Sequence, residues 1–150
     1  MKEEGTMHYI MKPMLFAVTA VLGVAFTIVP AHAQSRSRVL ANIPFDFSVG
    51  NTTLKAGSYT ISQLESGLLA FSSDDGKEHQ FALTVPGDAG SLSQEPHLVF
   101  TRYGNEAFLR RVFFAGNEDY HELLRSSRER ELIKNQASGA EFSLLLEPAP

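Results

Sequence analysis

The chain has 150 residues, of which 43% are hydrophobic and 20% charged, with a formal net charge of −4 and no cysteine. The absence of cysteine excludes disulfides, thiolate metal ligands and a lipid-modified cysteine. The mild acidity argues against a nucleic-acid partner, because proteins that bind the phosphate backbone usually carry a strong basic excess.

The first predicted element is an export signal. Lys12 supplies a positive charge, residues 14–29 form an apolar run, and Pro30 breaks any helix there. The run ends in Ala-His-Ala, which places small residues where a signal peptidase requires them. We therefore expect a signal-peptide helix and cleavage between Ala33 and Gln34.

The alternative reading of this segment is a membrane anchor. Spanning a bilayer takes about 20 apolar residues, whereas this run is shorter and ends at a proline. We expect residues 1–33 to be a signal peptide and residues 34–150 to be a single β-rich domain with no stable membrane anchor after cleavage. The mature domain would be periplasmic or secreted. Three start sites remain open: Met1, Met7 and Met11.

Two strands are expected at the start of the mature domain. Residues 39–49 alternate, but Pro44 lacks a backbone N–H, so this strand should lie at a sheet edge or carry a bulge. Turn sequences at 50–51 and 56–57 then bound a second strand, residues 58–64. The alternating apolar positions are Ile43, Phe45, Phe47 and Val49, then Tyr59 and Ile61.

A hairpin is predicted next. Residues 68–72 and 78–85 flank the sequence Asp-Asp-Gly-Lys, in which Gly76 can adopt a positive φ without a Cβ clash. Residues 86–96 are rich in glycine, serine and aspartate and are expected to form a surface loop.

A second hairpin is predicted from residues 97–103 and 106–114 around a Gly-Asn turn. This register sets Phe100 opposite Leu109 and Thr101 opposite Phe108. Since both faces are apolar, something should cover each of them. The expected faces are Leu98, Phe100, Leu109 and Phe113 on one side, and Val99, Phe108, Val112 and Phe114 on the other.

A short helix and a last strand complete the chain. Ser126 and Glu129 match a capping box, which predicts a helix from about residue 127 to 135. A helix starting at Asn117 is the alternative, although its apolar stripe is ragged. Residues 140–147 alternate and predict a strand.

Short strands at regular spacing with one late helix predict a mainly β fold. We expect an antiparallel β-sandwich or small barrel with one short helix in its C-terminal half, preceded by the signal-peptide helix. The pattern Leu-x-Ala-Gly-x-Tyr at 54–59 is similar to a segment of immunoglobulin-like and transthyretin-like domains, which favours a sandwich.

Three segments resemble a family of small exported bacterial proteins that has no assigned activity. They are residues 43–59 (IPFDFSVGNTTLKAGSY), residues 98–104 (LVFTRYG) leading to Phe108-Leu109, and residues 127–132 (SREREL). Lys55 departs from the family, whose members tend to have proline before the Ala-Gly turn. The resemblance implies export and a shared fold, and supplies no catalytic residues.

No metal, cofactor or catalytic site is predicted. His79, His97 and His121 lack the spacing of zinc ligands. Asp74 and Asp75 lack the alternating oxygen ligands of a calcium loop and are better explained as a turn. No Gly-x-Ser-x-Gly sequence marks a nucleophile.

An arginine cluster, Arg102, Arg110 and Arg111 beside Tyr103 and Phe108, has two interpretations. It could hold an acidic polymer or another anion. We favour a structural role, in which the arginines pair with acids at the edge of the core or extend their stems toward water.

Our leading hypothesis is a non-enzymatic binding or structural module that contacts an envelope or extracellular partner. The alternatives are a small carrier of an apolar ligand and a hydrolase without a recognised motif. The carrier requires a pocket of about 300 Å³ or more lined by Phe100, Leu109 and Phe113. The hydrolase requires a nucleophile, a base and an orienting group within hydrogen-bond reach of one another.

Overall fold

The computed structural model describes residues 37–65, 67–91 and 95–148. The expected signal peptide, residues 1–33, and the cleavage site between Ala33 and Gln34 lie outside the described residues. The strands join into one 11-stranded sheet, so the expected mainly β fold is confirmed. No helix in the described part of the chain combines the length and the apolar character needed to cross a bilayer.

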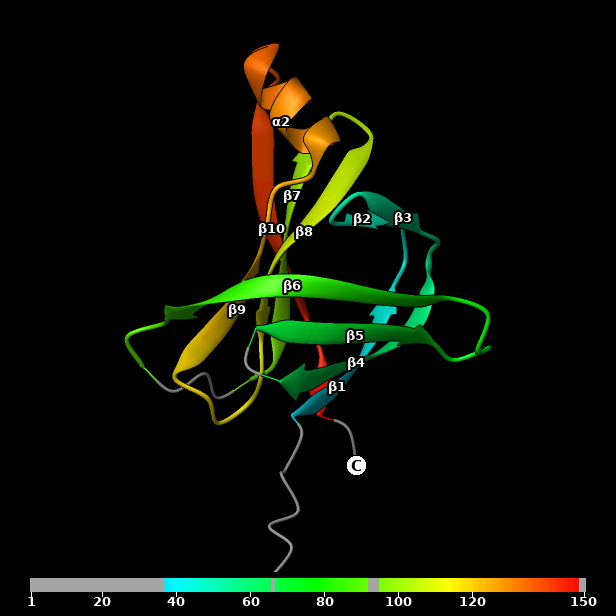
Figure 1. The fold of residues 1–150 in the computed structure, drawn as a ribbon, viewed down its shortest axis with the longest axis vertical. Coiled ribbons are helices and arrows are strands. Elements are labelled where there is room, and N and C mark those ends of the chain that lie inside the picture. The colour runs from blue at the N-terminus through cyan, green and yellow to red at the C-terminus, as the bar shows by residue number, and fades with distance from the viewer. Residues whose placement is uncertain (1–36, 66, 92–94, 149–150) are drawn as a thin grey trace, which may run out of the picture. The chain divides into compact units, whose positions relative to one another are not determined.

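The strands form two layers that run nearly crosswise to each other (Figure 1). One layer contains β1 (Arg38–Ile43), β4 (Gly57–Glu65), β5 (Leu68–Ser73) and the first half of β6 (His79–Asp88). The other contains the second half of β6, β9 (Asp119–Leu123), β8 (Glu106–Phe113), β7 (His97–Tyr103) and β10 (Gly139–Leu145). The remaining elements are β2 (Phe47–Val49), β3 (Thr52–Leu54), β11 (Glu147–Pro148) and the helix α2 (Ser127–Lys134).

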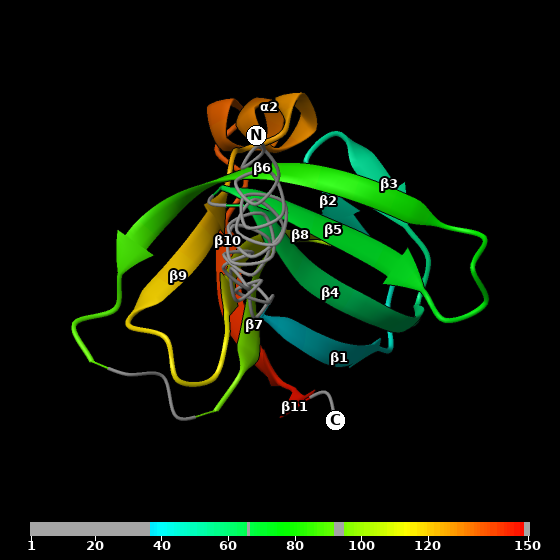
Figure 2. The same ribbon diagram turned by 60° about the horizontal axis from the view of Figure 1, so that its bottom comes forward.

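Two chain segments connect the layers. Strand β6 pairs with β5 up to Leu83 and with β9 from Thr84 onward, so it passes from one layer to the other. At the opposite edge, β10 pairs with β7 in one layer. Only Leu146 separates β10 from β11, and β11 pairs with β1 in the other layer. The architecture is therefore a two-layered sandwich whose layers share β6 at one edge and are joined through the successive strands β10 and β11 at the other (Figure 2).

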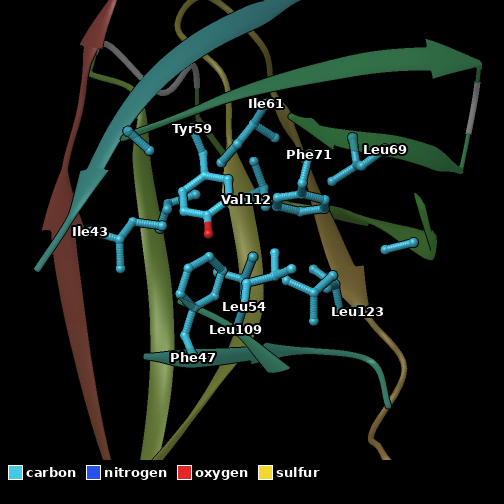
Figure 3. Packing of buried hydrophobic residues seen from close by; sticks show 14 of the residues in the cluster. Ile43, Phe47, Leu54, Tyr59, Ile61, Leu69, Phe71, Leu109, Val112 and Leu123 are labelled. Atoms are coloured by element: carbon cyan, nitrogen blue, oxygen red, sulfur yellow. The ribbon is translucent and has the colours of Figure 1, made fainter. Parts of the chain in front are cut away.

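The core fills the space between the layers (Figure 3). Phe47 and Tyr59 meet edge to face with ring centroids 5.4 Å apart, and Phe47 meets Phe100 at 5.8 Å. Burying a large apolar side chain contributes about 1.5–3 kcal/mol, so these rings supply much of the driving force for folding. Five of the expected inward positions are buried, and Phe45 is partly buried against the core; the five are Ile43, Phe47, Val49, Tyr59 and Ile61.

The predicted register of the hairpin formed by β7 and β8 is confirmed near its turn. Phe100 pairs with Leu109 and Thr101 with Phe108 around a Gly104 with φ of 60°. Farther from the turn a β-bulge shifts the register, so that Val99 pairs with Arg111. The extra residue is Arg110.

The bulge corrects the predicted faces of this hairpin. A bulge inserts one residue, so the side chains beyond it exchange faces. Val112 and Phe114 therefore belong to the core with Leu98, whereas Phe113 lies on the outer face against His97 and Tyr120. Val99 and Phe108 are buried on that outer face, so both faces are covered as expected.

Three other expectations need correction. The alternative helix from Asn117 is wrong, because Asp119–Leu123 is the strand β9. The expected loop 86–96 begins later, since β6 extends to Asp88. The first strand ends at Ile43, ahead of Pro44, and resumes as β2. The helix near 127–135 and the last strand are confirmed as α2 and β10.

Candidate apolar contact surface

The outer face of β5, β6 and β9 carries large apolar side chains in contact with solvent. Phe81, Leu83 and Val85 occupy successive outward positions of β6 and are 60%, 68% and 55% exposed. Leu124, directly after β9, is 60% exposed. We call these residues, with the half-buried Leu68 and Ala70 of β5, the apolar face.

The strand register makes the apolar face contiguous. Ala70 lies opposite Phe81, and Leu68 lies opposite Leu83. On the other side of β6, Thr84 pairs with Leu123, the last residue of β9, and Leu124 follows directly after this ladder ends. Contiguous exposed apolar surface of this kind marks contact sites in monomeric proteins, whereas single exposed apolar residues are common.

The local sequence explains this exposure. Within residues 81–85, the small side chains of Ala82 and Thr84 point inward and are buried, while the larger ones point outward. Ala82 belongs to the core cluster, and the Thr84 hydroxyl forms a hydrogen bond with the buried His121. Sequence reasoning missed this surface because the run is apolar at nearly every position. The small size of the inward residues is the signal that could have shown it.

Two charged residues near the apolar face lie on β9 or shortly after it. Glu122 pairs with Val85 across the ladder, and Arg125 follows Leu124. Glu122 accepts a hydrogen bond of 2.8 Å from the Arg110 guanidinium. Arg125 lies 4.0 Å from the Glu129 carboxylate, and its side chain is 56% exposed.

The three arginines of the predicted cluster point to different places. Arg102 lies over the rings of Phe45 and Phe142, with its guanidinium carbon 5.0 and 4.9 Å from their centroids. Arg111 donates to Glu141 at 2.5 Å. Arg110 is buried. The arginines therefore do not converge on one anion site, and each has a structural contact.

Arg110 is the centre of a buried ionic cluster beneath α2. Its guanidinium donates to the Leu123 carbonyl at 2.8 Å and to Glu129 at 3.4 Å, besides its bond to Glu122. Glu129 is only 2% exposed, and its Oε1 has no hydrogen-bond partner. Burial raises the pKa of the Glu129 carboxyl, while Arg110 and Arg125 oppose that rise.

The same glutamate forms the predicted helix cap. The Glu129 backbone N–H donates to the Ser126 hydroxyl at 2.9 Å, and the Ser126 backbone is one of the groups that lower the carboxyl pKa. The turn between β2 and β3 supplies a second cap, because the side-chain oxygen of Asn51 accepts a hydrogen bond of 2.9 Å from the Ser127 backbone N–H. These contacts fix α2 beside the end of β9.

The three histidines lie on separate strands. His79 contacts the Ser72 hydroxyl at 3.1 Å, His97 stacks on Phe113, and the buried His121 contacts the Thr84 hydroxyl at 3.2 Å. In the described part of the chain, no His, Asp and Glu side chains gather in a group that could hold a metal ion.

These histidine contacts also bear on the hydrolase hypothesis. His79 with Ser72 and His121 with Thr84 place a hydroxyl within hydrogen-bond distance of an imidazole. Within the ranges that the structure covers, neither ring has a carboxylate at hydrogen-bond distance to orient it. These pairs therefore lack the third group that a catalytic triad uses.

A polar hollow of about 470 Å³ lies between the turn before β4 and the turn after β5. The Tyr59 hydroxyl points into it, 2.7 Å from the Lys55 carbonyl and 2.5 Å from the Glu78 carboxylate. Asp75 accepts from the Ser73 hydroxyl and from the Lys77 N–H, which lowers its pKa to about 2. Asp75 thus stabilises the turn in which Gly76 has a φ of 69°.

The hollow does not match the pocket that the carrier hypothesis requires. Phe100 and Leu109 are buried in the core, whereas Phe113 lies on the opposite face of the sheet. These three side chains therefore line no common pocket.

Comparison with protein-family models, with curated proteins and with solved structures finds no match to this chain.

Proposed function

We propose that this protein is an exported, non-enzymatic β module that acts in the cell envelope or outside the cell by contact with a partner. The apolar face carries the proposal. Phe81, Leu83 and Val85 expose more than half of their surface at adjacent outward positions, and covering them would remove apolar area from water at a gain of about 25 cal/mol per Å².

The export part of the proposal rests on the sequence of residues 1–33. A charged start, an apolar run and a small-residue ending are the features that the export machinery recognises. Sequencing the N-terminus of the protein recovered from the envelope or the medium tests it. A start at Gln34 is the expected result, and an intact precursor confined to the cytosol would refute export.

The contact part is tested with a matched pair of variants. Leu83→Glu places a charge in the middle of the apolar face, and Leu145→Glu places the same charge at an equally exposed position on β10. The tagged proteins are used to capture binding partners from the native envelope fraction. We expect a partner that the wild type and Leu145→Glu retain and that Leu83→Glu loses.

Circular dichroism of both variants shows whether the fold is intact. Since Leu83 is 68% exposed, its replacement should leave the free energy of unfolding within about 0.5 kcal/mol of the wild type. Equal capture by Leu83→Glu and the wild type would contradict a role for this face.

A further inference from the structure

We propose that the open edge of β10 binds an extended peptide segment of another protein, which joins the sheet as a further strand and sets a carboxylate against Arg102. This site is separate from the apolar face, which lies on β5, β6 and the end of β9. The inference therefore goes beyond the proposed contact of that face and does not depend on it.

The first argument is a row of unpaired main-chain groups. β10 is the last strand of its layer (Figure 1), and in the described part of the chain only β7 pairs with it. The Leu146 N–H bonds the Pro96 carbonyl across this ladder at 2.9 Å. Since bonded and non-bonded positions alternate in an antiparallel pair, the even-numbered residues bond to β7 and the odd-numbered ones direct their N–H and C=O groups to the open side. The latter include Glu141, Ser143 and Leu145.

The sequence of β10 lacks the features that usually protect a sheet edge. Exposed edges are commonly kept short, or they carry lysine, proline or a bulge that prevents further pairing. β10 has seven residues without lysine or proline, and it keeps one register along its whole pairing with β7. The other edge strands of the described sheet, β3 and β11, have three and two residues. β10 is therefore the edge best suited to accept another strand.

The second argument is that the core is incompletely covered along the same edge. Among the described residues, the apolar side chains that pack against the core while partly exposed are Phe45, Phe142, Leu144 and Leu146. Phe45 meets Phe142 with ring centroids 5.5 Å apart, so all four lie on or beside the end of this layer. Side chains of an added strand that lie opposite Phe142 and Leu144 point to the same face and cover them. The partner should therefore carry apolar residues at alternate positions.

Arg102 sets the charge of the partner. It lies opposite Ala140 near the start of β10, with its guanidinium carbon 4.9 Å from the Phe142 ring centroid. Within the ranges that the structure describes, its contacts are the rings of Phe45 and Phe142, and no carboxylate lies at ion-pair distance. An aspartate or glutamate of the added strand at this level would form a charge-assisted hydrogen bond with it.

A second copy of β10 does not have this chemistry. Its residues on the core side are Ala140, Phe142 and Leu144, none of which is acidic. Its one carboxylate, on Glu141, faces the outer side and already pairs with Arg111. The occupant is therefore a segment of a different protein, with apolar side chains at alternate positions and an acidic residue in line with them at the Arg102 end.

The test uses the full protein, purified as the cell delivers it, and a phage-displayed library of random peptides of about nine residues, long enough to pair with the whole of β10. Enriched peptides should alternate apolar residues and carry aspartate or glutamate. Synthetic copies should bind with dissociation constants of about 1–100 μM. Hydrogen exchange of the Glu141, Ser143 and Leu145 amides should slow when the peptide binds, because these amides face the open edge.

A matched pair of variants tests the main-chain contact. Ser143→Pro removes one N–H from the open edge and leaves the bonds to β7 in place, since proline is tolerated where the N–H faces solvent. It should raise the dissociation constant of the selected peptides by about tenfold or more. Ser143→Thr keeps the N–H and should bind like the wild type. Circular dichroism shows whether both variants are folded.

Arg102→Glu tests the charge independently of the backbone. Selection on this variant should replace the acidic residue of the enriched peptides by lysine or arginine. The peptides selected on the wild type should bind it about fivefold more weakly at low salt, and the difference should shrink as salt screens the charges.

Several outcomes would overturn the proposal. Selection on the wild type that enriches no alternating acidic peptide refutes it, and so do peptides that bind Ser143→Pro as tightly as the wild type. If the edge amides are already protected in the free protein by self-association that Ser143→Pro abolishes, the occupant is a second copy and the inference is wrong. Peptides that Leu83→Glu loses and Ser143→Pro retains bind the apolar face, in which case this inference fails while the proposed function stands.

Discussion

The guanidinium of Arg110 lies 3.4 Å from the buried carboxylate of Glu129 and thereby joins β8 to α2. This contact exists because of the bulge at Arg110, which adds one residue to β8 and directs a charged side chain to the outer face of the hairpin.

Replacing Arg110 should be costly. Arg110→Met leaves the Glu129 carboxylate buried without its nearest cation, so we expect the free energy of unfolding to fall by about 3–5 kcal/mol. The double variant Arg110→Met/Glu129→Leu should recover most of the loss, because apolar groups of similar size often replace a buried ion pair without penalty. Urea unfolding monitored by circular dichroism measures both.

Arg128→Met is the matched control. Arg128 pairs with Glu106 and Glu131 at the surface, so its loss should cost less than about 1 kcal/mol. A double variant as unstable as Arg110→Met alone would show that an uncompensated charge is not the cause.

A pH dependence is expected from His121. Burial lowers the pKa of its imidazole, opposed by the nearby Asp119. The unfolded chain therefore binds this proton more tightly than the folded one, so stability is complete above a pH of about 6.5 and declines as the pH falls through the folded-state pKa.

The measurement compares urea unfolding at about pH 7.5 and 5 for three proteins. His121→Gln should depend less on pH than the wild type, although it is less stable overall because it disturbs the contact with Thr84. His79→Gln, which changes an exposed histidine, should keep the wild-type dependence. The same pH dependence of stability in His121→Gln and the wild type would exclude His121 as its source.

Glu129 acts in the opposite sense, because its raised pKa favours the folded state at low pH.

The Tyr59 hydroxyl should stabilise the two turns that flank the polar hollow. It has one hydrogen and two acceptors, the Lys55 carbonyl and the Glu78 carboxylate. Tyr59→Phe should lower the free energy of unfolding by about 1–2 kcal/mol. In a Glu78→Gln background the same change should cost less, and the difference in a double-mutant cycle gives the coupling energy. Strict additivity would mean that the two side chains do not interact.

The strands nearest their turns were predictable because local signals agree there. Phe100 and Leu109 are set opposite each other by the Gly-Asn turn and by apolar periodicity together. The β9 strand was not predictable in the same way, since its inward positions are His121 and Leu123. A buried histidine looks polar in the sequence, and only its contact with Thr84 on a distant strand explains it.

The bulge and the apolar face could not be predicted for a different reason. Nothing near Arg110 shows that it will be the extra residue, because its partners Glu122 and Glu129 come from β9 and α2. The outward direction of Phe81 depends on which side of a uniformly apolar run meets the core. That choice is made by tertiary packing rather than by the local pattern.

A pair of phenylalanine substitutions tests this distinction between core and contact surface directly. Phe100 is fully buried, with the rings of Phe45 and Phe142 at 5.2 and 5.5 Å, whereas Phe81 is 60% exposed. Phe100→Ala should lower the free energy of unfolding by about 3–5 kcal/mol, because it removes the transfer energy of the ring and leaves a cavity. Phe81→Ala should change it by less than about 0.5 kcal/mol.

Both variants are measured by urea unfolding at a protein concentration low enough to keep the chain monomeric, so that association does not add to stability. A large loss for Phe81→Ala at low concentration would place this ring in the core. The apolar face would then be part of the hydrophobic core and not a contact surface.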